Sequence, residues 1–106
     1  MSDGGLMVTN NEASQQFEVH LDGLLARLVY QRAGERIRLI HTEVPDALAG
    51  RGIGSALART ALGYAQERQL RVVPSCPFVR SYIERHPEYR ELVTAQSSSR
   101  PNRLIP

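Results

Sequence analysis

The sequence predicts a mixed α/β (α+β) fold, in which an antiparallel β-meander is followed by a βαβ unit and a short C-terminal helix. Strand-like runs separated by turns fill the first half, one amphipathic helix follows a glycine-rich turn, and a short β-branched run comes after that helix. The chain has 106 residues, which is enough for one domain. We expect this domain at residues 14–93, between a flexible N-terminus (1–13) and a flexible C-terminal tail (94–106), because both ends are polar and lack periodicity.

The meander is expected to contain three strands. The dipeptide Asp22-Gly23 favours a tight hairpin turn between the first two, and a second turn at 33–35 leads into the third. The third strand ends at Pro45, because proline cannot donate a hydrogen bond to a sheet. The expected strands are residues 16–21, 24–30 and 36–44.

An amphipathic helix is expected to begin at Ile53 and to lie on the sheet. Its apolar face consists of six residues at helical spacing: Ile53, Ala56, Leu57, Ala61, Tyr64 and Ala65. The β-branched run 70–73, closed by Pro74, is expected to return parallel to the third strand through a right-handed crossover. A short helix is expected over 78–85, before Pro87.

Composition narrows the functional classes. The net charge is +2 and the arginines are scattered, so nucleic-acid binding is not expected. No apolar run is long enough to cross a bilayer and the first residues lack the pattern of a signal peptide, so we expect a cytoplasmic protein with no membrane partner. The single cysteine, Cys76, agrees with a reducing compartment. It also excludes a cysteine zinc cluster, and the histidines are dispersed, so no metal is expected.

The turn at residues 50–55 predicts an anion site. A strand, a glycine turn and a helix together present backbone N–H groups that have no partner inside the helix, and the helix dipole adds positive charge there. Glycine allows a phosphate to approach closely, and Arg51 could contact a second phosphate. A purely structural role in turning the chain is the alternative. The spacing lacks the Gly-x-Gly-x-x-Gly and Gly-Lys-Ser/Thr patterns of dinucleotide and nucleoside-triphosphate sites.

The glycine turn, the segment Cys76-Pro77 and the run Tyr82–Tyr89 together resemble the minimal, GNAT-like N-acetyltransferases, over about residues 14–93. The resemblance implies a minimal GNAT-like fold, acetyl-CoA as cosubstrate and an amine as acceptor. The two glycines of the family's Gln/Arg-x-x-Gly-x-Gly/Ala motif fall on Gly52 and Gly54, but the leading position is Ala49, which removes one side-chain contact. By resemblance, the cofactor-binding residues are Glu43, Val44 and Pro45 for the pantetheine arm, and Gly50, Arg51, Gly52, Ile53, Gly54 and Ser55 for the pyrophosphate.

Four residues are candidates for catalysis. His41 and Glu43 share one face of the third strand, and either could take the amine proton, directly or through water. Cys76, before a short helix, could be a thiolate nucleophile. By resemblance, Tyr82 would protonate the departing CoA thiolate. The alternatives are solvated sheet residues, an inert buried cysteine and an aromatic anchor for the helix.

The sequence therefore predicts an acetyltransferase that moves the acetyl group of acetyl-CoA to an amine, directly or through Cys76. The alternative is a module that binds CoA or acyl-CoA without turnover, because the chain lacks the extra helices with which larger family members enclose a substrate. The identity of the acceptor and the oligomeric state do not follow from these motifs.

Overall fold

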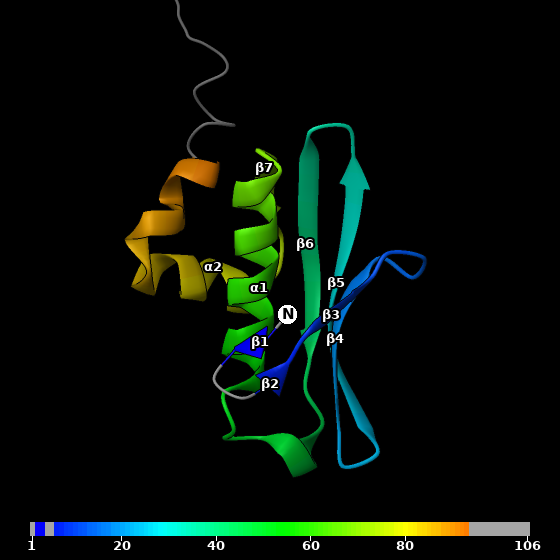
Figure 1. Ribbon diagram of the computed structural model, residues 1–106. Helices are drawn as coiled ribbons and strands as arrows, with labels where there is room; N and C mark the ends of the chain where they lie inside the picture. Colours follow the sequence, from blue (N-terminus) through cyan, green and yellow to red (C-terminus); the bar gives the residue numbers. More distant parts are fainter. Residues whose placement is uncertain (1, 4–5, 94–106) are drawn as a thin grey trace, which may run out of the picture.

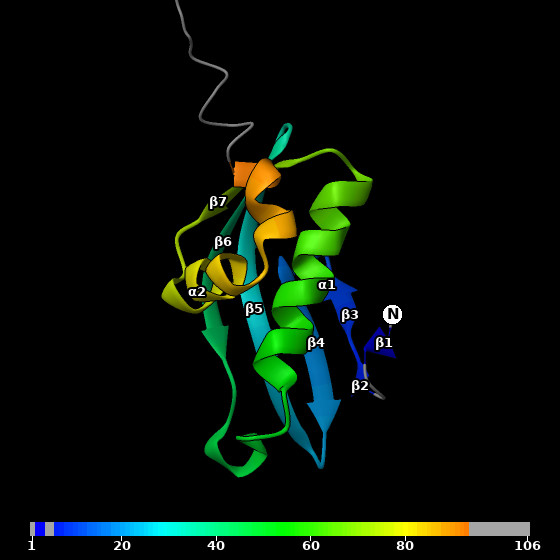
Figure 2. The same cartoon turned by 90° about the vertical axis from the view of Figure 1, so that its left-hand side faces the viewer.

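A computed structural model describes residues 2–3 and 6–93 and shows one five-stranded sheet with helices packed on one of its faces (Figures 1 and 2). The sheet has the order β3-β4-β5-β6-β7. Its strands are β3 (Thr9–Asn11), β4 (Gln16–Leu21), β5 (Leu24–Ala33), β6 (Arg36–Glu43) and β7 (Arg71–Pro74). The helices are α1 (Ile53–Glu67) and α2 (Pro77–Arg85), with 3₁₀ turns η1 (Asp46–Leu48) and η2 (Pro87–Tyr89). A separate two-stranded sheet joins β1 (Ser2–Asp3) to β2 (Leu6–Met7).

The predicted fold class is confirmed. Strands β3 to β6 pair antiparallel, while β6 and β7 pair parallel and are connected through α1. The element ends differ from the prediction by a few residues. The largest difference is in β5, which continues to Ala33 because residues 31–33 pair with the start of β6.

Strand β3 was not part of the sequence prediction, which placed no strand before residue 14. Residues 9–11 are short and polar, so they show no alternation, yet they pair with residues 16–18 of β4. The preceding Val8 is fully buried and supplies the apolar contact that this edge strand lacks by itself. The predicted C-terminal tail, 94–106, lies outside the described residues.

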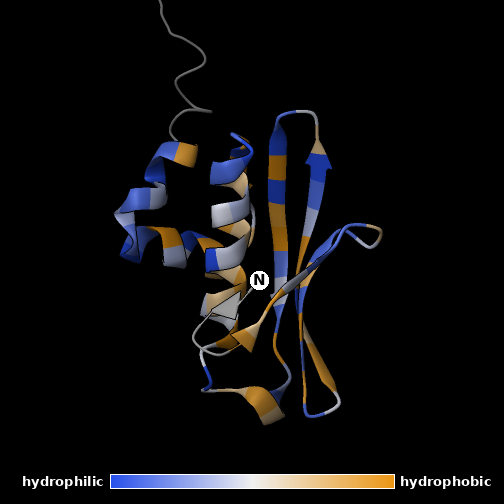
Figure 3. Ribbon diagram, in the orientation of Figure 1, coloured by the Kyte–Doolittle hydropathy of each residue, from blue (hydrophilic) through white to orange (hydrophobic). Residues whose placement is uncertain are grey.

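The core lies between the sheet and α1. All six residues of the predicted apolar face of α1 are buried, against sheet residues such as Phe17, Leu28 and Leu39. Figure 3 shows hydrophobic and hydrophilic residues alternating along β6, as expected for a strand with one face on the core. We call the opposite face of the sheet, which no helix covers in Figure 1, the open face.

A β-bulge in β6 changes which residues face the core. Val29 pairs with His41 and Tyr30 pairs with Leu39, so Ile40 has no direct partner in β5. An extra residue in one strand reverses the alternation beyond it. Thr42 therefore lies on the core side, and His41 and Glu43 lie on the open face.

Strand β7 is shorter than β6, and this leaves part of β6 without a neighbour. The parallel pairing ends at Leu39 and Pro74, after which the chain turns into α2. Within the described chain, residues 40–43 of β6 have no strand on the side away from β5, and residues 41–43 pair with β5 alone. We call this segment the free β6 edge. It leads through Val44 and Pro45 to η1 and the start of α1.

Candidate active site

The turn before α1 leaves backbone N–H groups without partners. Gly52 caps the helix in the left-handed region, with φ 75° and ψ 15°, and Gly50 has a φ of 80°. No side chain caps the helix, and within the described residues the N–H groups of 53–55 donate to no protein acceptor. The first turn also contains no acidic residue to offset the positive end of the helix dipole. The residues present therefore fit a phosphate group.

Two side chains lie against this turn. Arg51 forms an exposed ion pair with Asp22 of the β4–β5 hairpin, with 3.1 Å between the guanidinium nitrogen and the carboxylate oxygen, so a phosphate would compete with Asp22 for it. Phe78, in the first turn of α2, packs over Gly54: a Cβ added at Gly54 would lie 2.9 Å from the end of the phenyl ring. The glycine thus allows the first turns of α1 and α2 to meet.

Cys76 lies between β7 and α2, with its side chain against β6. Its backbone N–H donates to the Leu39 carbonyl at 2.9 Å, and its Sγ is 3.4 Å from the Thr42 hydroxyl. Only 4% of the residue is exposed. The thiol therefore faces the free β6 edge from the core side of the sheet.

The surroundings of Cys76 favour its thiolate form. Burial raises the pKa of the thiol, but the Thr42 hydroxyl lowers it, as do the backbone N–H groups of Val79, Phe78 and Thr42. The net effect places the pKa of Cys76 below its ordinary value. A thiolate is the form of cysteine that acts as a nucleophile.

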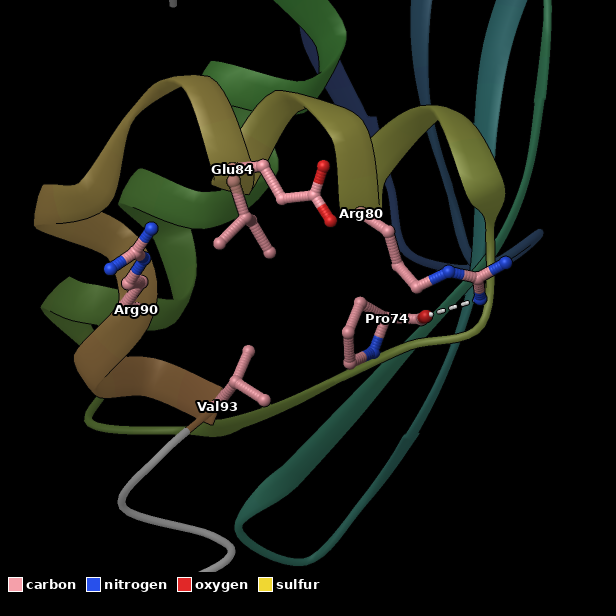
Figure 4. A pocket seen from close by; sticks show the side chains of 6 residues that line it. Pro74, Arg80, Glu84, Arg90 and Val93 are labelled. Atoms are coloured by element: carbon pink, nitrogen blue, oxygen red, sulfur yellow. Dashed lines mark hydrogen bonds between the residues drawn. The ribbon is translucent and has the colours of Figure 1, made fainter.

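Two arginines hold the loop that carries Cys76. Arg80 of α2 donates to the carbonyls of Pro74, at 3.0 Å, and Ser75, at 3.1 Å, and the first of these bonds is visible in Figure 4. Arg38 of β6 donates to the Ser75 hydroxyl at 3.0 Å. The loop is therefore tied to both the helix and the strand beside it.

Figure 4 also shows a pocket beside α2, with a volume of about 240 Å³. Its lining consists of Pro74, Arg80, Ile83, Glu84, Arg90 and Val93. None of the predicted site residues lines this pocket, so we do not place the active site there.

His41 and Glu43 lie on the open face, on the other side of the sheet from Cys76. Their side chains are 3.8 Å apart, measured from His41 Nε2 to Glu43 Oε2. Arg27 of β5 donates to Glu43 at 2.8 Å. This hydrogen bond and the charge of Arg27 lower the pKa of Glu43 below its ordinary value. Glu43 is consequently a weak base at neutral pH.

Further polar side chains continue across the open face. Arg27 also donates to Gln16 at 3.3 Å, and Gln16 donates to Glu18 at 2.6 Å. His20 lies 2.9 Å from the same carboxylate. Hydrogen bonds from Gln16 and His20 lower the pKa of Glu18, although burial raises it in part. The open face is thus polar across β4 and β5, beside the end of β6 that carries His41 and Glu43.

Tyr82 is buried between α1 and α2. Its hydroxyl accepts a hydrogen bond of 3.2 Å from Arg59 of α1, which leaves the hydroxyl hydrogen available for donation. The ring stacks on His86, with 4.0 Å between ring centroids. The structure thus pairs Tyr82 with α1 and not with Cys76.

The predicted site residues are spread over several places. Cys76 stands at the free β6 edge on the core side, and His41 and Glu43 stand on the open face. Residues 50–55 stand at the start of α1, and Val44 and Pro45 lead there from β6. Tyr82 stands apart from Cys76, with its hydroxyl at Arg59. Sequence reasoning missed Thr42 and Arg27. Thr42 was missed because the bulge that turns it toward Cys76 leaves no pattern in the sequence. Arg27 is 16 positions away from Glu43, so only the pairing register brings them together.

Two kinds of feature are absent from the part of the chain that the structure describes. No three or more His, Cys, Asp or Glu side chains are grouped so that they could hold a metal ion. No helix there combines the length and the apolar content needed to cross a membrane.

Comparisons with known proteins identify the family of this fold. A family model described as GCN5-related N-acetyl-transferase matches residues 16–92. Protein NATD1 of Mus musculus is 39% identical over 87 residues, which is 79% of this chain and 79% of the mouse protein. Protein NATD1 of Danio rerio is 32% identical over 93 residues, covering 83% of this chain and 84% of the fish protein.

A solved structure from Staphylococcus aureus, determined in solution by NMR and described as GCN5-like, has a similar fold. It superimposes with a TM-score of 0.65 at 27% sequence identity, and the match covers 85% of this chain and 89% of the other. The family model spans β6, α1, β7 and α2, and the relatives and the solved structure each match most of the chain.

Proposed function

The chain belongs to the GCN5-related N-acetyltransferase family, and from that membership we propose that it binds acetyl-CoA and transfers the acetyl group to an amine. One observation carries the proposal: Cys76, with a lowered thiol pKa, faces the free β6 edge, and that edge leads directly to a helix start suited to phosphate. In acetyl-CoA, the pantetheine arm connects the thioester to the pyrophosphate.

Acetyl-CoA would be held at two places. The N–H groups at residues 52–55 would bind the pyrophosphate, with Gly50 and Arg51 beside it, because that turn has unpaired donors and no acidic residue in its first helical turn. The pantetheine arm would lie along Glu43, Val44 and Pro45, where β6 has no neighbouring strand. Backbone groups of a strand edge bind an extended amide chain in the way that a further strand would.

The acceptor amine would approach from the open face, where His41 and Glu43 lie. Its nitrogen would attack the thioester carbonyl carbon, forming the C–N bond as the C–S bond breaks and CoA leaves as a thiolate. His41 would accept the amine proton, with the Glu43 carboxylate orienting its ring. Tyr82, whose hydroxyl hydrogen is available, is the proposed proton donor to the thiolate.

A two-step route through Cys76 uses the same arrangement. The Cys76 thiolate would attack the thioester carbonyl, so that the acetyl group becomes bound to Sγ and CoA leaves. The amine would then attack this second thioester and release the thiolate again. The hydroxyl and N–H of Thr42 lie at the sulfur and would stabilise its negative charge both before the thiolate attacks and after it is released.

Intact-mass spectrometry after incubation with acetyl-CoA tests the proposal, with release of free CoA thiol followed in parallel. We expect an acetyl adduct that hydroxylamine removes and that Cys76→Ala abolishes. Cys76→Ser, which keeps the shape of the side chain, is the matched variant for loss of the thiolate alone. Transfer to an amine that continues in Cys76→Ala would favour the direct route. CoA binding with no acetyl transfer to any amine of a broad panel would instead identify a binding module.

A further inference from the structure

A second pocket lies on the open face, close to the proposed active site. Its volume is about 170 Å³, and β5, β6 and β7 all contribute to its lining: Gln31, Ala33, Arg36, Arg38 and Val73. The residues between the arginines and after them, Ile37 and Leu39, are fully buried in the core. Both arginines therefore project from the open face, and no acidic side chain lines the pocket.

Neither arginine is neutralised. Within the described part of the chain, no carboxylate forms a salt bridge with Arg36 or Arg38, whereas Arg27 and Arg51 each have one. Arg38 donates to the Ser75 hydroxyl, one residue before Cys76. Two unneutralised guanidinium groups in one pocket fit a carboxylate or a phosphate, which guanidinium binds through paired hydrogen bonds.

The pocket and the proposed proton acceptor lie on the same face of the same strand. Arg38 and His41 pair with Gln31 and Val29 of β5, which are two positions apart because the bulge adds one residue to β6, and this corresponds to about 7 Å along a strand. The arginine side chain can reach along the strand, so the gap between the bound groups is shorter. Beyond His41, the Glu43 carboxylate forms an ion pair with Arg27, so that end of the site carries balanced charge. The open face thus presents unpaired positive charge at the Arg36 and Arg38 end of the site and balanced charge at the other end.

We propose that the acceptor is a primary amine that also carries an anionic group, and that Arg36 and Arg38 bind this anion while the amine lies at His41. This inference builds on the acetyl transfer proposed above and adds the class of the acceptor. Diamines and polyamines are disfavoured, because their second ammonium group would meet the two arginines. The anion can be a carboxylate, as in a free amino acid, or a phosphate, as in a phosphorylated amine.

The test is to add each of three probes to the chain in the presence of CoA and to measure binding from the NMR amide shifts. The probes are 6-aminohexanoate, 5-aminopentyl phosphate and 1,6-diaminohexane. Loss of one charge-assisted contact changes affinity by about tenfold or more. We therefore expect at least one anionic amine to bind about tenfold or more tightly than the diamine. Which anionic probe binds more tightly identifies the source of the anion.

Variants assign the preference to the pocket. Arg38→Gln should reduce the preference for the anionic amines over the diamine. Substitution of both Arg36 and Arg38 by glutamine should bring the affinities to within about twofold of each other, since both charged contacts are then lost. Arg85→Gln, an exposed arginine at the end of α2, is the matched control and should keep the preference. Equal binding of all three probes to the unmodified protein, binding of none, or a preference that survives substitution of both Arg36 and Arg38 would overturn the proposal. Binding is measured without turnover, so the two proposals can fail separately. If the protein prefers the anionic amines but acetylates no amine, the proposed acetyl transfer is wrong and the assignment of the anion site to this pocket stands.

Discussion

Replacement of Gly52, the N-cap of α1, by alanine should destabilise the protein, whereas the same replacement of Gly63 inside α1 should stabilise it. At φ 75° and ψ 15°, Gly52 is in the left-handed region, and a Cβ added there would meet no atom within 4 Å. The only penalty for Gly52→Ala is thus the backbone conformation, about 1–2 kcal/mol. We expect the free energy of unfolding to fall by that amount, which corresponds to roughly 4–8 °C in Tm for each kcal/mol.

Gly63→Ala is the matched control. Gly63 lies inside α1 without a positive φ, and an added Cβ would also meet nothing within 4 Å. Alanine is preferred to glycine in a helix interior, so this variant should be more stable than the unmodified protein by about 0.5–1 kcal/mol. Gly52→Asn should lose less than Gly52→Ala, because asparagine tolerates the left-handed region better.

Urea unfolding, monitored by far-UV circular dichroism, measures the unfolding free energy of all three variants. The comparison requires that the slope of this free energy against urea concentration is the same in each variant. Equal stability of Gly52→Ala and Gly63→Ala would refute the reasoning, because the two changes differ only in backbone conformation. Acetyl-CoA affinity gives a second reading. We expect Gly52→Ala to weaken it, since relaxation of the strained turn would redirect the N–H groups of residues 53–55, and Gly63→Ala to leave it unchanged.

Three further predictions follow from the site and the core. The Cys76 thiolate, followed by its ultraviolet absorbance, should form at a pH below that of an ordinary thiol, and Thr42→Val should raise this midpoint; identical midpoints would contradict the Thr42 contact. Glu43 should titrate below an ordinary glutamate in a carbon-detected NMR titration, and Arg27→Gln should raise its pKa. Since the folded pKa is the lower one, the stability contributed by this pair is complete above the unfolded pKa and is lost as pH falls through the folded pKa, so the two proteins should converge in acid. Leu57→Ala, at a fully buried position, should lower the unfolding free energy by about 2–5 kcal/mol in urea titrations, and an effect below 1 kcal/mol would contradict the core assignment.

Local patterns were sufficient for much of the fold. The apolar face of α1 follows from helical spacing alone, and the turns at Asp22-Gly23 and 33–35 divide the meander where the structure does. Pro45 stops the third strand in both the prediction and the structure, because a proline has no N–H to donate. These features depend on residues that are neighbours in the sequence.

The features that were missed depend on contacts between distant residues. The Ile40 bulge arises from the pairing of β5 with β6, and it alone decides that Thr42 faces Cys76. The close approach of Phe78 to Gly54 arises from packing between two helices, so the sequence suggested a phosphate role or a chain turn for that glycine and not this contact. Strand β3 is held by β4 and by burial of the preceding Val8, and its own residues carry no strand pattern.

The central claim is that residues 50–55 and the free β6 edge bind one acetyl-CoA molecule. Amide chemical shifts, measured while acetyl-CoA is added to the labelled protein, test this claim most directly. The account predicts that the largest changes fall at residues 52–55 and 40–45, with a smaller group at Cys76 and the start of α2. Changes confined to the pocket beside α2, or no changes at saturating acetyl-CoA, would contradict it.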